Sequence, residues 1–298
     1  MGLDVGSHSI KCAKVRKESG GVYTLMSSSV EEVGPQKDPI QRGQAVQRAL
    51  KAVAAEKSPI IAAVGGPGTV LRSVVVPKMT PQELKTALTF EAEKYIPFKL
   101  DEVFIDSAIL GDQPGGRMEI TLGAARKELV QGLLEMLTSA GTAPAAVDLE
   151  SVALADAWEI SRPASGAEPV GLVHIGIRGT ILSFFKETRL QFTREIPLGG
   201  DSLSKEGTEG SKEQWHSQCR ASFDFYENQF GQRVARLYLS GGFSGLQGLR
   251  EWIQEATGLP TELWNPLSGL KTSLSADQVQ AIGPSLAVAV GLGARGVK

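Results

Sequence analysis

The chain has 298 residues with 31 basic and 33 acidic side chains, so its formal net charge of −2 gives no support for nucleic-acid binding. The length is enough for two domains that each bury a core. Two cysteines, Cys12 and Cys219, are too few for a disulfide framework, and no run approaches the ~18 apolar residues of a membrane span. With no basic leader segment before Asp4, we expect a cytoplasmic protein without a transmembrane segment.

The first third of the chain has the pattern of an α/β domain. Residues 3–33 alternate like strands, and Gly20-Gly21 marks a hairpin turn. Apolar residues at helical spacing predict a helix over 40–55. Two further strands are expected at 60–64 and 70–76. We assign residues 1–79 to the first part of a first domain.

A well-marked helix begins next. Thr80 is a suitable N-cap, Pro81 fits the first helical position, and Glu83 completes a capping box. Strands are expected at 103–110 and 118–124, followed by a helix over 129–140. This order of helix, strand, strand and helix predicts a small α+β subdomain, residues 80–144, inserted into the first domain.

The second half is expected to form another α/β domain. We interpret residues 145–165 as a return segment and linker, and 166–298 as the second domain. The polar stretch 199–214 lacks periodicity and is predicted to be a mobile loop. The remaining elements are strands within 170–196 and at 236–240, and helices at 218–230, 246–257 and 284–294. The last helix is rich in small residues, which predicts close packing.

Three glycine-containing turns indicate a nucleotide cleft. The first, Leu3-Asp4-Val5-Gly6-Ser7, has the same apolar–polar–apolar–Gly pattern as Val173-His174-Ile175-Gly176, and Ser240-Gly241-Gly242 follows later. Glycines at strand turns let backbone N–H groups approach a phosphate closely. The repeat predicts a duplicated domain with a ligand between the two copies.

The first turn carries the strongest candidate residues. Asp4 is placed to hold a water of Mg²⁺, Gly6 and Ser7 to bind phosphate oxygens through N–H groups, and Lys11 to neutralise phosphate charge. The alternative is an ordinary hairpin with a solvated lysine.

The other two turns are less specific. Gly176 and Thr180 fit a second phosphate turn, whereas His174 favours packing because Mg²⁺ prefers oxygen ligands. Ser240, Gly241 and Gly242 are expected to pass under the adenine or ribose, with a simple strand-to-helix turn as the alternative.

These residues in this order resemble the actin-like ATPase superfamily, and more closely the PilM family of type IV pilus assembly, relatives of FtsA. The most specific segment is Phe90-Glu91-Ala92-Glu93-Lys94-Tyr95-Ile96-Pro97-Phe98. The other similar segments are Ala124–Glu128, Val147–Glu150, Phe192–Gly200 and Gly283–Ala287.

The resemblance implies duplicated actin-like (ribonuclease H-like) α/β domains, a small α+β insertion in the first and ATP with Mg²⁺ in the cleft. It also implies that Glu150 orients the attacking water, with a helix-surface carboxylate as the alternative. A PilN-like inner-membrane protein is the expected partner, its cytoplasmic tail docking near Leu84, Leu88 and Tyr95. The protein would then be peripheral to the inner membrane, and self-association is possible.

Two departures from the family pattern bear on function. His174 stands where the family has Asp, and the lid region 201–217 is short. We therefore expect a docking scaffold with weak or vestigial ATP binding. The alternatives are an active ATPase driving assembly and, more weakly, a sugar or acetate kinase of the same superfamily.

Overall fold

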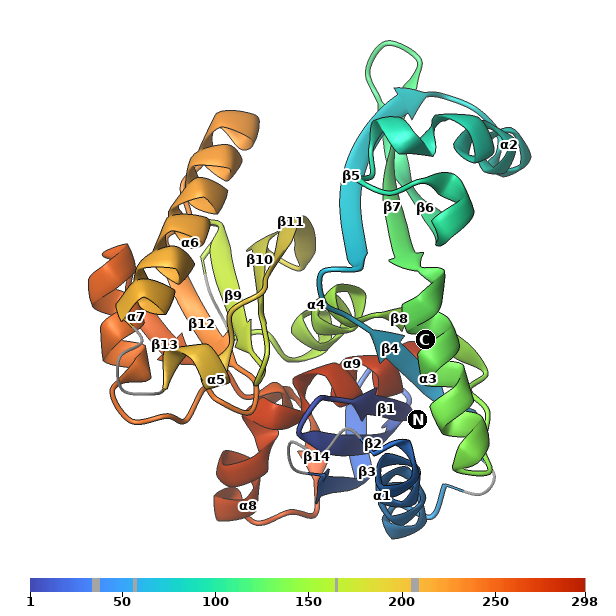
Figure 1. Cartoon of the computed structure of the whole chain (residues 1–298). Coiled ribbons are helices and arrows are strands. Elements are labelled where there is room, and N and C mark those ends of the chain that lie inside the picture. The colour runs from blue at the N-terminus through green and yellow to red at the C-terminus, as the bar shows by residue number, and fades with distance from the viewer. Residues whose placement is uncertain (34–37, 56–57, 164–165, 205–208, 298) are drawn as a thin grey trace.

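The computed structural model describes residues 1–33, 38–55, 58–163, 166–204 and 209–297. These residues form two large domains and a small lobe that projects from the first domain (Figure 1). Each of the three parts is organised around its own β-sheet.

The first domain, as far as it is described, contains a six-stranded sheet in the order β14-β3-β2-β1-β4-β8. Its strands are β1 (Gly2–Val5), β2 (Ser9–Lys17), β3 (Tyr23–Glu32), β4 (Ile61–Val64), β8 (Ala146–Leu149) and β14 (Lys271–Thr272). β1, β2 and β3 pair antiparallel, whereas β1, β4 and β8 pair parallel. The parallel strand β4 is buried along its whole length, as expected for a strand covered on both faces.

Helices cover both faces of this sheet. The helices on one face are α1 (Pro39–Ala52) and α3 (Lys127–Ser139), and those on the other are α4 (Glu150–Ser161) and α9 (Ala287–Arg295). Because side chains alternate along a strand, Cys12 packs toward α1 and α3 while Ala13 packs toward α4 and α9.

The second domain repeats this arrangement with described strands in the order β11-β10-β9-β12-β13. They are β9 (Val170–Ile175), β10 (Thr180–Lys186), β11 (Arg189–Ile196), β12 (Arg236–Ser240) and β13 (Thr261–Leu263). β9, β10 and β11 pair antiparallel, and β9, β12 and β13 pair parallel. The same pairing pattern in both domains confirms the duplicated α/β architecture predicted from the glycine turns.

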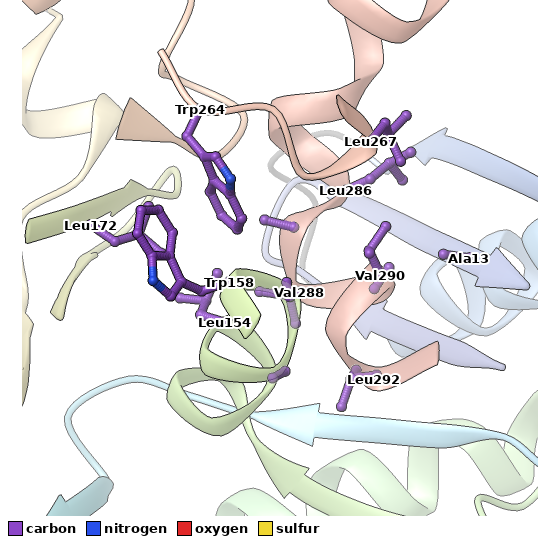
Figure 2. Packing of buried hydrophobic residues seen from close by; sticks show 14 of the residues in the cluster. Ala13, Leu154, Trp158, Leu172, Trp264, Leu267, Leu286, Val288, Val290 and Leu292 are labelled. Atoms are coloured by element: carbon purple, nitrogen blue, oxygen red, sulfur yellow. The ribbon is translucent and has the colours of Figure 1, made fainter. Parts of the chain in front are cut away.

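One face of the second sheet packs against helices of its own domain, and the other packs against the first domain. The covering helices are α5 (Gly200–Leu203), α6 (Glu209–Phe230) and α7 (Leu249–Thr257). On the opposite face, Trp158 of α4 lies 5.2 Å from Phe185 and 5.4 Å from Trp264, centroid to centroid. Figure 2 shows Trp158 and Trp264 facing each other beside α9, in the core that joins the domains.

The segment between β13 and α9 consists mostly of short helices. It contains η3 (Pro266–Gly269), α8 (Ala276–Ile282) and η4 (Gly283–Leu286). The helix predicted at 284–294 is therefore a 3₁₀ turn followed by α9. Its close packing is confirmed, because a Cβ at Gly291 would lie 1.8 Å from the Ala153 carbonyl oxygen.

The small lobe is a three-stranded sheet in the order β5-β7-β6 with helices on one face. Its elements are β5 (Thr69–Pro77), α2 (Pro81–Glu91), η1 (Ala92–Lys94), η2 (Leu100–Glu102), β6 (Val103–Gln113) and β7 (Arg117–Arg126). The predicted capping box is present: Glu83 N donates to Thr80 Oγ1 at 3.3 Å, and Thr80 N donates to Glu83 Oε2 at 2.7 Å.

Two elements bear on where this lobe begins and ends. β5 pairs along its length with β7, and α3 packs into the core of the first domain beside α1. We therefore propose 69 and 126 as the lobe boundaries, in place of the expected 80 and 144.

The loop prediction for 199–214 is wrong where the structure describes it. Residues 200–203 form α5, and α6 begins at Glu209 rather than at 218; residues 205–208 lie outside the described residues. The buried positions of α6 begin at Trp215, so its first turns are polar and carry no periodic signal. In the return segment, residues 146–149 form strand β8 before α4 begins, and 164–165 lie outside the described residues.

Candidate functional site

A cleft of about 690 Å³ lies between the two large domains. The first domain contributes the turn between β1 and β2, and the second contributes the turn between β9 and β10. The loop at Gly65-Gly66, Glu150, Glu195 and the Gly242-Phe243 turn complete the walls. The strand-end turns that the sequence singled out therefore converge on one cavity.

Asp4 and Lys11 form a buried ion pair at the base of the cleft. They are register partners on β1 and β2, and Lys11 Nζ donates to Asp4 Oδ2 at 3.0 Å. Their exposed fractions are only 6% and 9%. Because a buried charge requires compensation, the lysine neutralises the aspartate before any ligand enters.

The turn after β1 is fixed by a residue that sequence analysis missed. Arg42 of α1 donates from Nη2 to the Gly6 carbonyl at 2.9 Å and from Nη1 to the Ser7 carbonyl at 3.2 Å. The pKa of this half-buried guanidinium is lowered, mainly by burial and then by the nearby charge of Arg178. Arg42 carries no local motif, because only the tertiary fold brings α1 against the turn.

His174 lines the cleft, and one of its ring nitrogens is engaged with Ser240 of the second domain. Its Nδ1 and Ser240 Oγ lie 2.9 Å apart, and burial lowers its pKa to about 4, so the imidazole is neutral at pH 7. The Ser240 hydroxyl is therefore engaged in a hydrogen bond with the His174 ring.

The other candidates of the second domain differ in access to the cleft. Gly241 lies beneath the end of β9, where an added Cβ would be 2.3 Å from the Ile175 carbonyl oxygen, while Gly242 lines the cleft. Gly176 and Thr180 also line it, although Thr180 Oγ1 already donates to the Leu198 carbonyl and accepts from Trp215 Nε1.

Two glutamates face the same cavity. Glu150 begins α4, contacts Gly65 and has its pKa raised to about 8 by burial and then by the charges of Asp4 and Glu195. Glu150 thus lines the cleft at the first residue of α4, and its role in orienting a water stays a prediction. Glu195 of β11, which sequence analysis did not select, accepts a hydrogen bond from Thr69 Oγ1 at 2.6 Å, and burial raises its pKa to about 7.

Asp4, Glu32, Glu150 and Glu195 line the cleft, and a magnesium ion at a phosphate site is held by one or two carboxylates together with phosphate oxygens and waters. Among the described residues, no group of three or more His, Cys, Asp or Glu side chains is placed to hold a metal. Asp4 has one oxygen engaged with Lys11, and His174 offers nitrogen where Mg²⁺ prefers oxygen.

The residues expected near a partner lie in the small lobe. Leu84 and Leu88 are only 4% and 7% exposed and form part of the lobe core, whereas Tyr95 is half-buried at its edge. Arg126, at the junction of β7 and α3, lies over the Phe98 ring at 5.2 Å. Its Nε is buried without a hydrogen-bond partner in the described part of the chain.

Comparisons with known proteins agree with this architecture. The family model described as type IV pilus assembly protein PilM matches residues 2–210 and 211–297. A solved PilM-PilN type IV pilus biogenesis complex aligns with 26% identity and a TM-score of 0.84, covering 100% of this chain and 98% of that one.

More distant structures share the fold alone. A Bacteroides thetaiotaomicron protein with an actin-like ATPase fold and unknown function is 10% identical, with a TM-score of 0.52 and coverage of 89% of this chain and 90% of that one. The ethanolamine utilization protein EutJ from Carboxydothermus hydrogenoformans is 15% identical, with a TM-score of 0.50 and coverage of 98% and 88%. None of the described helices is long and apolar enough to cross a membrane.

Proposed function

The chain belongs to the PilM family of type IV pilus assembly proteins, and from this premise we propose that it is a cytoplasmic scaffold that docks the N-terminal tail of a PilN-like inner-membrane protein. The observation that carries the proposal is the whole-chain match to a PilM-PilN complex. In this role the protein is peripheral to the inner membrane and reaches it through its partner, in a pilus or related secretion system.

The edge where the small lobe meets α3 is the docking surface that the contacts favour. Leu84 and Leu88 are buried and unavailable, so we assign docking to Tyr95, Phe98 and Arg126. The buried Nε–H of Arg126 has no partner among the described residues, which is uncommon in folded proteins, and it pairs with an outside acceptor once the Arg126 side chain moves. An extended peptide supplies such an acceptor in its backbone carbonyls.

Peptide titration with site variants tests this surface. Tyr95→Ala and Arg126→Gln should each weaken binding of a synthetic PilN-like tail roughly tenfold, because a short peptide depends on a few anchors. Ile109→Ala and Arg72→Gln remove exposed side chains of the same lobe outside the 90–98 segment and serve as matched controls. Thermal melts separate lost docking from lost folding: equal binding by wild type and both test variants, with unchanged melts, rules the surface out.

We further assign to the cleft a weak or vestigial capacity for Mg-ATP. The cavity is lined at positions that suit phosphates and ribose by Gly6, Ser7, Gly176 and Gly242. It can therefore accommodate a nucleotide. The paired Asp4 and neutral His174 argue against tight binding of the metal complex.

An active ATPase is the alternative, and the position of Glu150 favours it. A carboxylate lining the cleft with a pKa of about 8 is suited to accept a proton from an attacking water. Under this alternative, purified protein releases phosphate from Mg-ATP and Glu150→Gln abolishes the release. Phosphate release at the buffer rate by the wild type, with tail docking intact, supports the scaffold.

A further inference from the structure

A second hollow, of about 500 Å³, lies between the small lobe and the second domain, and we call it the lobe groove. One wall is the lobe sheet, to which β5, β6 and β7 contribute side chains. The other wall consists of β11 and the last turns of α6, and residues of α4 line the groove between the two walls. Figure 1 shows the lobe and α6 on opposite sides of this space.

The lobe turns its uncovered face toward the groove. Glu119 and Thr121 of β7 line the groove, whereas Met118, Ile120 and Leu122, which alternate with them, lie in the lobe core beneath the helices. The sheet is therefore covered by helices of the lobe on one face, and its other face lies opposite the second domain.

Apolar side chains are exposed on both walls of the lobe groove. Val75 and Leu110 on the lobe side are 39% and 46% exposed, and Phe225 on the α6 side is 44% exposed. The Phe225 ring lies 5.4 Å from the ring of Phe192, centroid to centroid, and both residues line the groove. Apolar surfaces that face each other across a narrow space gain from contact, because contact removes them from water.

Several polar side chains of the groove are already engaged within their own wall. On the lobe side, Ser73 Oγ and Gln113 Nε2 donate to Glu119 at 2.6 and 2.8 Å. On the other side, the Tyr226 hydroxyl donates to Gln191. These groups need no acceptor or donor from a bound ligand, so the apolar side chains are what the groove leaves to be covered.

The lobe is organised as a separate unit that is joined at its base. Its core cluster contains only residues between 70 and 124, within the part of the chain that the structure describes. At the base, Leu71 and Ala125 pack into the core of the first domain. The loop that leads into β5 contains Gly66, which has a φ of 96° and at which a Cβ would meet nothing within 4 Å. A lobe with its own core and a short connection at one end is suited to hinge motion.

Two contacts hold the walls in a fixed alignment while they leave the space between them open. Near the base, Thr69 Oγ1 donates to Glu195 at 2.6 Å. Farther out, Arg189 forms an ion pair with Glu119, the register partner of Val75. Both contacts therefore align β11 antiparallel to β5, although the two strands belong to separate sheets. With this alignment, a small tilt of the lobe about its base brings the two walls together.

We propose that the small lobe is a hinged clamp that closes on the second domain, with Val75 and Leu110 packing against Phe225. In the closed state the walls of the lobe groove fill it themselves. The free chain exchanges between open and closed forms, and the apolar contact sets the balance between them. Closure requires neither a docked tail nor a nucleotide, and so it goes beyond the proposed scaffold function.

Disulfide trapping in the full chain tests the proposal. Gln113→Cys/Gln229→Cys places one thiol on each wall and leaves the apolar side chains intact. A disulfide requires the two Cα atoms to come within about 7 Å, so the bond reports that the walls have met. Cys12 and Cys219 are buried and do not compete. We expect this pair to form an intramolecular disulfide under mild oxidation, as measured by thiol counting and non-reducing electrophoresis.

A matched pair and a matched substitution control for accessibility. Ile109→Cys/Gln229→Cys should stay reduced, because Ile109 is exposed but pairs with Ile120 on the helix-covered face of the lobe. Adding Phe225→Ser to the reporting pair should slow disulfide formation several-fold. Adding Leu246→Ser, which removes an exposed apolar side chain outside the groove, should leave the rate unchanged. Thermal melts of the reduced proteins confirm that each variant is folded.

Spin labels measure the same motion without a cross-link. Lys85→Cys on α2 and Glu255→Cys on α7 are exposed labelling sites outside the lobe groove. We expect two populations of label-to-label distance, with the shorter one reduced by Phe225→Ser. The proposal is overturned if the Gln113→Cys/Gln229→Cys pair oxidises no faster than the Ile109→Cys control, if Phe225→Ser leaves that rate unchanged, or if a single distance is found in both proteins.

Discussion

Glu150 lies at the start of α4 among the residues that line the cleft, and burial is the main reason that its pKa is raised to about 8. In the unfolded chain the same group has its ordinary pKa of 4.5. The stability that this group contributes is therefore fully present below pH 4.5 and is lost as the pH rises through 8.

Glu150→Gln removes that pH dependence. We expect its free energy of unfolding to exceed that of the wild type by a margin that grows between about pH 5 and pH 8, reaching roughly 1 kcal/mol or more. Urea unfolding at both pH values measures the margin. Glu135→Gln, at an exposed position of α3, is the matched control. A margin that stays constant over this range contradicts the assigned burial of Glu150.

Gly241 and Gly242 are adjacent glycines with different roles. Gly241 has a φ of 96° and lies under Ile175, whereas a Cβ at Gly242 would meet nothing within 4 Å. Gly241→Ala should lower stability by about 2 kcal/mol or more, because backbone strain and a backbone clash add. Gly242→Ala should change it by less than about 0.5 kcal/mol. Thermal melts distinguish the pair, and equal losses would show that β12 can shift away from β9.

At the level of elements, local chemistry was predictable and long-range pairing was not. The capping box of α2 and the glycine turns after β1 and β9 depend only on residues that are neighbours in the sequence, and both features are present. The assignment of β5 to the small lobe depends on its pairing with β7, which lies tens of residues further along the chain, so no local sequence pattern predicted it. Arg42 and Glu195 reach the cleft for the same reason: their partners come from distant segments.

The pair of α4 and α9 offers a test of element packing. Gly291 of α9 lies against the Ala153 carbonyl of α4, whereas a Cβ at Gly132 of α3 would meet nothing within 4 Å. Gly291→Ala should destabilise the protein by about 2–4 kcal/mol, because the helices have to move apart. Gly132→Ala should stabilise it by about 0.5–1 kcal/mol through helix propensity. Chemical unfolding of both variants checks the opposite signs, and a small loss at Gly291 would mean that the two helices separate easily.

At the scale of the whole molecule, β11 joins the second domain to the small lobe. Its first residue, Arg189, forms an ion pair with Glu119 of β7, and Glu195 near its other end accepts from Thr69 at the start of β5 at 2.6 Å. One strand of the second domain thus contacts both the lobe and the wall of the cleft. A movement of β11 relative to the first domain therefore acts directly on the lobe that we propose as the docking site.

Removing both contacts should loosen the lobe from the second domain without unfolding either. In the variant Thr69→Val/Arg189→Gln, we expect backbone amides of β5 and β11 to exchange hydrogen several-fold faster. The part-buried Thr69–Glu195 hydrogen bond contributes about 0.5–1.5 kcal/mol and the Arg189–Glu119 ion pair about 0.2–1 kcal/mol, and both contacts are made by the edge strand β11. Amides of β1 and β4, in the middle of the first sheet, should keep their protection. Arg236→Gln breaks an ion pair between β12 and β13 within the second domain and serves as the control. Hydrogen-exchange mass spectrometry makes the comparison, and unchanged exchange in β5 and β11 would show that the shared core around Trp158, rather than β11, sets the position of the lobe.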